Sequence, residues 1–232
     1  MVLLFYLIEG DEENEMRQLF NMDNGIFRWL SKAFDCIWLN LLFLLTCIPI
    51  FTIGAGMTAY YYTMQKVIRH DRDYVGSAFW HGFKTNFKQA TLTWLIALLM
   101  MLLTIIDFRF MKAFAEAGHK VGAIYPIFLV LFAFVVLWCV YLFPYMSRFV
   151  NTMKRTMWNA LLISILNLPW TILILVLIVL ACLAMYIMPI SLFFVPAIFV
   201  SLLNRILERI FRKYMSEEDR AMEDELNREY KN

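Results

Sequence analysis

Three asparagines inside uncharged stretches are the side chains of this chain best suited to bind a solute. They are Asn40, Asn159 and Asn167. A side-chain amide both donates and accepts hydrogen bonds, so amides that face one space could hold a neutral solute such as a sugar. The same groups commonly bond between neighbouring helices, at about 0.6–2 kcal/mol each. We expect this packing role, and a site built on Asn40 and Asn167 is the alternative.

Residue types that hold metals or act as nucleophiles do not occur at useful spacings. His70, His81 and His119 lie far apart in polar connections, so each is expected to be a solvated surface residue. The four cysteines lie in apolar runs without a Cys-x-x-Cys pair, which is typical of small buried hydrophobic residues. The sequence also lacks a glycine-rich phosphate loop and a Gly-x-Ser-x-Gly motif. We therefore expect neither an enzyme nor a cofactor.

An uncharged run over residues 36–65 contains helix-breaking residues at its centre. As one straight helix it would extend about 45 Å at 1.5 Å per residue, against a hydrocarbon core of about 30 Å. Pro49, Gly54 and Gly56 are of the types that bend or end helices. The run therefore predicts a helical hairpin that turns through these three residues.

The composition places these elements in a membrane. The chain has 232 residues, of which 62% are hydrophobic and 17% charged, whereas soluble domains have about 45–50% and 25%. Its net charge of +2 is too small to indicate nucleic acid as a partner. The apolar stretches predict an all-α transmembrane bundle with short amphipathic interfacial helices. Six spans are expected, five being the alternative, near residues 33–49, 51–67, 88–108, 121–147, 157–186 and 188–206.

Lysine and arginine predict the orientation of the bundle. With six spans, only Arg109, Lys112 and Lys120, of 21 such residues, lie opposite the termini, so the positive-inside rule places both termini in the cytoplasm. Residues 1–15 are expected to be a disordered leader or to precede the natural start, and residues 216–232 to be a charged tail. The predicted basic face on the cytoplasmic side comprises Lys66, Arg69, Arg72, Lys84, Lys88, Arg148, Lys154 and Arg155.

Several short motifs are distributed along the apolar sequence. They are Leu19-Phe20-Asn21, Trp38-Leu39-Asn40, Ile48-Pro49-Ile50, Thr52-Ile53-Gly54, Thr58-Ala59-Tyr60, the stretch 86–91 and Asn167-Leu168-Pro169. With these motifs, residues 16–215 resemble the YesL family, a domain-of-unknown-function family of bacterial multi-pass membrane proteins. The resemblance implies one membrane domain in the bacterial cell membrane. It implies no catalytic residues, because the family has no established activity.

The resemblance also implies a functional context. Members of the YesL family often accompany sugar-utilisation genes and ABC-type carbohydrate importers. We therefore expect an accessory or assembly factor whose partners are the lipid bilayer and the permease subunits of such an importer. A small secondary transporter for a sugar or other neutral solute is the alternative. Ion-coupled transporters usually keep ionisable groups within their spans, whereas the predicted spans carry charge only near their ends.

Overall fold

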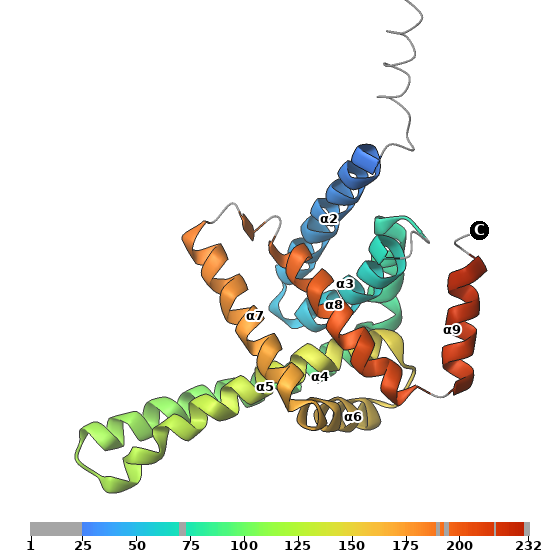
Figure 1. Ribbon diagram of the computed structural model, residues 1–232. Helices are drawn as coiled ribbons and strands as arrows, with labels where there is room; N and C mark the ends of the chain where they lie inside the picture. Colours follow the sequence, from blue (N-terminus) through green and yellow to red (C-terminus); the bar gives the residue numbers. More distant parts are fainter. Residues whose placement is uncertain (1–24, 70–72, 189–190, 193–194, 216, 230–232) are drawn as a thin grey trace, which may run out of the picture.

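A computed structural model describes residues 25–69, 73–188, 191–192, 195–215 and 217–229 of the chain (Figure 1). The predicted leader, residues 1–15, lies outside these residues. In order, the elements are α2 (Gly25–Cys47), the 3-10 turn η1 (Ile50–Thr52), α3 (Ile53–Thr63), the π-helical segment η2 (Met64–Arg69), α4 (Val75–Glu116), the 3-10 turn η3 (Lys120–Ile124), α5 (Tyr125–Arg148), α6 (Met153–Leu166), α7 (Leu168–Ile187), α8 (Val195–Tyr214) and α9 (Glu217–Glu229).

The predicted fold class is confirmed, because the described part of the chain is helical without strands and has several long apolar helices. Four segments are long and apolar enough to cross a membrane: Leu30–Cys47, Val75–Glu116, Lys120–Arg148 and Leu168–Ile187. Two predicted spans, 51–67 and 188–206, are not among them. The first contains only the short α3 and η2, and the second overlaps the amphipathic α8. The number of membrane crossings therefore stays a prediction.

The connection between α2 and α3 is a 3-10 turn that follows Pro49. The Thr52 hydroxyl lies 2.5 Å from the carbonyl oxygen of Thr46 and 2.7 Å from that of Pro49. The indole nitrogen of Trp94, on α4, donates to the carbonyl oxygen of Ile50 at 2.8 Å. The turn is thus closed by side-chain hydrogen bonds and attached to α4.

Gly54 and Gly56 lie inside α3, not in the turn that the sequence predicted for them. A Cβ atom at Gly54 would lie 2.5 Å from Cβ of Trp94 and 2.7 Å from the carbonyl oxygen of Ala90, and one at Gly56 would lie 2.6 Å from Thr46 Oγ1. The glycines are therefore required for close helix approach rather than for a special backbone conformation. They allow α3 to pack directly against α2 and α4.

The two helices α4 and α5 form a long hairpin that projects from the other helices (Figure 1). The 42 residues of α4 correspond to about 63 Å of helix, about twice the hydrocarbon thickness. This one helix contains the predicted span 88–108 and extends beyond both of its ends. Large apolar side chains along the projecting part, such as Leu99 and Ile106, are exposed, which suits a surface that contacts lipid.

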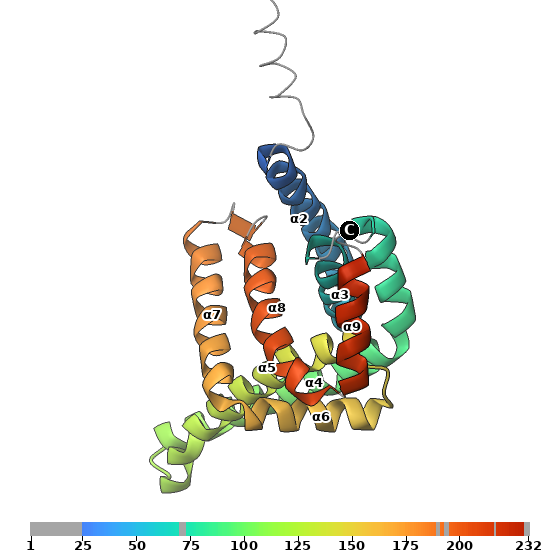
Figure 2. The ribbon, with the colours of Figure 1, turned by 45° about the vertical axis from the view of Figure 1, so that its right-hand side comes forward.

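The predicted span 157–186 is divided into two helices. The helix α6 ends at Leu166, and α7 begins at Leu168. The α6 helix lies crosswise at the foot of α7 and α8 (Figure 2). The physical reason is Pro169, which lacks a backbone N–H and is tolerated in the first turn of a helix but not in its interior. It lies in the first turn of α7, and Asn167 just before that helix has non-helical backbone angles, φ −115° and ψ 41°. The structure thus has a sharp corner where the sequence predicted one continuous span.

Candidate functional site

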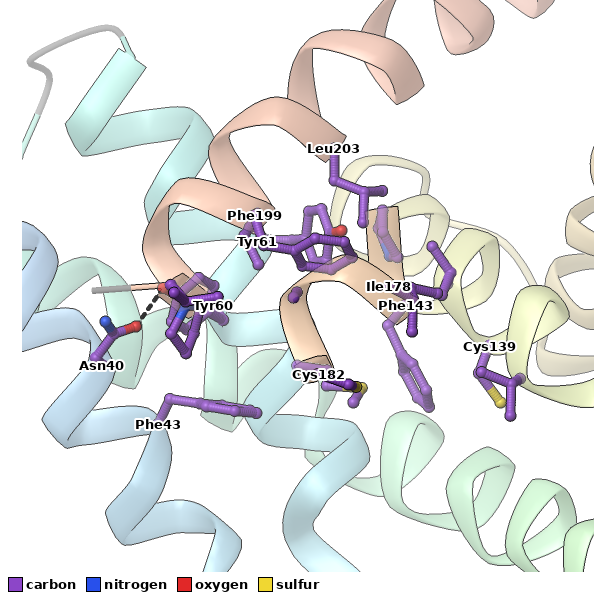
Figure 3. Close-up of a pocket in the computed structure, with 18 of the residues that line it drawn as sticks. Asn40, Phe43, Tyr60, Tyr61, Cys139, Phe143, Ile178, Cys182, Phe199 and Leu203 are labelled. Carbon is purple, nitrogen blue, oxygen red and sulfur yellow. Dashed lines mark hydrogen bonds between the residues drawn. The ribbon is translucent and has the colours of Figure 1, made fainter. Parts of the chain in front are cut away.

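A cavity of about 470 Å³ lies among helices α2, α3, α4, α5, α7 and α8 (Figure 3). Its volume is within the range of about 300–1,000 Å³ that is usual for small-molecule sites. None of the described residues that line it is charged. The larger side chains around it are aromatic or methionine, and they include Phe43, Met57, Tyr61, Trp94, Met101, Phe143, Met185 and Phe199. The cavity is therefore suited to an apolar occupant.

One corner of the cavity carries a polar pair. The Tyr60 hydroxyl on α3 donates to Oδ1 of Asn40 on α2 at 2.5 Å, and both residues are buried (Figure 3). The Tyr60 ring also meets Phe43 edge-on, with 5.2 Å between the ring centroids. The amide of Asn40 thus connects two helices, in line with the packing role expected from the sequence, although it also lines the cavity.

The beginning of α7 is attached to α5 and α6 by buried side chains. Of its residues, Thr171 and Ile174, near its beginning, are buried. The Thr171 hydroxyl lies 2.9 Å from the Tyr141 hydroxyl of α5 and donates to the carbonyl oxygen of Ser164 at 2.8 Å. Beyond this anchor, α7 contributes Ile178, Ala181, Cys182 and Met185 to the cavity. The cavity therefore occupies the space between the later part of α7 and α5.

A buried polar cluster joins three elements at the end of α5. We call Gln65, Arg148, Asn204 and Glu208 the Glu208 cluster. Glu208 is 5% exposed, forms an ion pair with Arg148 and accepts a hydrogen bond from the Gln65 amide. Asn204, one helical turn before Glu208, donates to Gln65 Oε1 at 2.8 Å. The cluster attaches α8 to η2 and to the last turn of α5.

Sequence reasoning missed Glu208, which lies between the predicted span 188–206 and the predicted charged tail 216–232. A usable signal was present in the helical periodicity. Leu203, Leu207 and Ile210 recur on one face of α8, and all three are buried. Asn204 and Glu208 are spaced i,i+4 and lie next to that face. A carboxylate at such a position needs a partner, because burying an unpaired charge is costly.

The other two candidate asparagines lie outside the cavity lining. Asn159 donates to the Tyr145 hydroxyl at 2.9 Å, which connects α6 to α5. Asn167, at the corner between α6 and α7, donates to the carbonyl oxygen of Ile163 at 2.9 Å and to the Tyr214 hydroxyl at 3.1 Å. The structure therefore does not bring Asn40 and Asn167 to a common site.

The structure divides the predicted basic face into paired and exposed residues. Lys66 bonds to Asp73 at 2.8 Å, which holds the pKa of the Asp73 carboxyl below its usual value. Arg148 belongs to the Glu208 cluster. The side chains of Arg69 and Arg72 lie outside the described residues. The remaining four are exposed, and we call them the basic patch: Lys84, Lys88, Lys154 and Arg155.

The basic patch lies where α4 meets the start of α6. The Gln89 amide on α4 donates to the carbonyl oxygen of Asn151 at 3.2 Å and to Thr156 Oγ1 at 3.3 Å. Lys88 precedes Gln89, and Arg155 precedes Thr156. These two bonds thus place side by side two helical segments that are far apart in the sequence and that both carry exposed cations. Among the described residues, no group of three or more His, Cys, Asp or Glu side chains could hold a metal ion.

Comparison with known proteins gives one match. Residues 36–108 match a family described as a protein of unknown function, DUF624. The matched region extends from α2 through α3 into α4 and includes Asn40, Pro49, Gly54 and Gly56. No curated protein and no solved structure matches the chain. Over residues 36–108 the chain is therefore similar to a family whose function is unknown. This region supplies cavity-lining residues from α2, α3 and α4.

Proposed function

We propose that this integral membrane protein is an accessory or assembly factor for an ABC-type carbohydrate importer of the bacterial cell membrane, and not an enzyme. The importer is suggested by the resemblance to the YesL family. The structural observation that supports a contact function is the basic patch, which gathers exposed cations from α4 and α6 on the side predicted to be cytoplasmic. The patch would meet an acidic surface of the permease subunits.

The positive charges of the basic patch do not stabilise the helices that carry them. Lys154 and Arg155 lie in the first turn of α6, which has no acidic residue. The helix dipole favours negative side chains there, and a cation is disfavoured by about 0.3–1 kcal/mol. Lys84 and Lys88 have i,i+4 spacing and carry like charge, which is also slightly unfavourable. An anionic partner would offset both costs.

A small secondary transporter is the second candidate, because the cavity has the volume of a ligand site. Its lining makes a sugar a poor substrate. A sugar has several hydroxyl groups that need hydrogen-bond partners when they leave water. The polar corner of the cavity offers Asn40 and Tyr60, which already bond to each other. This alternative would therefore require a more apolar neutral solute.

Uptake and co-purification together test the accessory function. Deleting the gene should slow oligosaccharide uptake and leave import of unrelated solutes intact. A Lys88→Gln/Arg155→Gln double variant should reproduce the defect and lose the permease subunits during purification in mild detergent. The matched control is Arg109→Gln/Lys120→Gln, which removes two exposed cations from the tip of the α4–α5 hairpin.

Two results would contradict this proposal. One is unchanged oligosaccharide uptake after the deletion, together with sugar movement into liposomes that contain only the purified protein; the transporter function would then replace the accessory one. The other is that the unaltered protein binds vesicles of anionic lipid through the basic patch, while the double variant still retains the permease subunits during purification. In that case the patch would serve membrane attraction alone.

A further inference from the structure

We propose that the cavity is a binding site for one acyl chain of a membrane lipid, which enters alongside α7. This inference does not depend on an importer partner. It rests on three features of the cavity: the helices that form its walls, the chemistry of its lining and its connection to the protein surface.

The walls of the cavity belong to segments that lipid would surround. Four of the helices that line it, α2, α4, α5 and α7, contain candidate membrane spans. Val179 and Leu183 of α7 are exposed, whereas Ile178 and Cys182, one residue before each, line the cavity. The same helix thus faces the cavity on one side and the bilayer on the other.

The lining chemistry excludes water as a stable occupant. A buried water needs two to four polar partners, and the side chains around the cavity are almost entirely aliphatic, aromatic or methionine. An empty space of this size would forfeit dispersion contacts along all its walls. A hydrocarbon chain restores those contacts, and it leaves an environment as apolar as the one it enters. Met57, Met101 and Met185 suit such a chain, because methionine adapts to irregular apolar shapes.

The cavity is connected to the surface along α7. Cys182 lines the cavity and is nevertheless exposed, whereas Cys139 on α5 also lines it and is 5% exposed. Figure 3 shows the two cysteines from α7 and α5 around the same space. A lipid chain could therefore pass Cys182 and reach Cys139 without crossing a polar layer. Among the lining residues that the structure describes, none is charged and able to bind a headgroup, so the headgroup would stay outside.

Photo-crosslinking of the full-length protein in nanodiscs tests the proposal. The probe is a phosphatidylcholine with a diazirine in the middle of one acyl chain, and the crosslinked residues are mapped by mass spectrometry. Lipid around the protein should label exposed residues such as Leu129 and Val130. An acyl chain inside the cavity should in addition label Cys139 and Phe143, which are 5% and 1% exposed and which surrounding lipid cannot reach.

A cavity-filling variant separates the site from general lipid contact. Ala181→Trp places an indole in the cavity and should reduce labelling of Cys139 and Phe143 several-fold. Leu180→Trp places the same side chain on the exposed face of α7 and should leave the labelling unchanged. Labelling of exposed residues should be equal in both variants.

The outcomes that overturn the proposal are distinct from misfolding. If Ala181→Trp does not fold, the labelling pattern of the unaltered protein decides by itself. Labelling restricted to exposed residues in that protein would overturn the proposal. Equal labelling of Cys139 in the two tryptophan variants would also overturn it, as would a non-lipid molecule that co-purifies and blocks the label.

Discussion

Replacing Glu208 with leucine should destabilise the protein strongly, because it leaves the Arg148 guanidinium in a largely buried position without its carboxylate. Breaking a buried ion pair by removing one partner costs about 3–5 kcal/mol. The Arg148 side chain is 16% exposed and also bonds to the Met215 sulfur at 3.3 Å, so we expect the lower end of that range. The Gln65 amide loses its acceptor in the same variant.

The double variant Arg148→Met/Glu208→Leu should recover most of this loss. Replacing both charges by apolar groups of similar size is often neutral or even stabilising, since no charge then stays buried. Together with the single variant Arg148→Met, these variants form a thermodynamic cycle whose coupling energy should be about 2 kcal/mol or more, within the range seen for residues in contact. Unfolding of the purified protein by sodium dodecyl sulfate in mixed micelles would measure it.

The matched control is Arg205→Leu, which removes an exposed charge from the same helix and should change stability by no more than about 0.5 kcal/mol. The role assigned to the Glu208 cluster would be refuted if Glu208→Leu were as stable as this control. It would also be refuted if the losses in the two single variants simply added in the double variant.

Three further predictions concern packing and topology. Gly54→Ala should cost about 1–3 kcal/mol by overpacking, since its Cβ would lie 2.7 Å from the Ala90 carbonyl oxygen. Gly76→Ala, with no neighbour nearer than 3.9 Å, should be neutral or stabilising in the same unfolding assay. Equal losses of stability in the two variants would contradict the close-packing role. Tyr60→Phe removes the hydroxyl that donates to Asn40 at the corner of the cavity and should cost about 1–3 kcal/mol of stability. An unchanged unfolding midpoint would contradict this prediction. Asn232→Cys, in a background without native cysteines, should react with a membrane-impermeant maleimide only after cells are opened, and labelling of intact cells would disprove a cytoplasmic C-terminus.

The structural consequences of Pro49 and Pro169 illustrate what could be predicted locally. Either proline would disturb a helix, because a missing N–H and a fixed φ act on the adjacent turn whatever the rest of the chain does. The structure has a 3-10 turn after Pro49 and a corner at Asn167 and Leu168, just before Pro169. The direction that the chain takes after each break was not predictable, since it depends on which surfaces the next helix can pack against.

The cavity and the Glu208 cluster show why the candidate site could be predicted only in part. Asn40 was identified from its residue type and surroundings, but its bond to Tyr60 depends on the close approach of α2 and α3 that Gly56 allows. Gln65 and Glu208 are separated by 143 positions in the sequence. No local pattern specifies such a contact, because it forms only when α8 packs back onto η2.

By itself, the sequence determined that the chain is helical and lies in a membrane, because apolar stretches of this length have few alternatives in lipid: every backbone group must be bonded within the segment. It also determined where those stretches are interrupted. Only the tertiary structure decided which polar groups are buried, which cations of the basic face stay exposed and where helices stand apart to leave a cavity. These properties depend on contacts between residues distant in sequence, and neither hydropathy nor local backbone preference specifies such contacts.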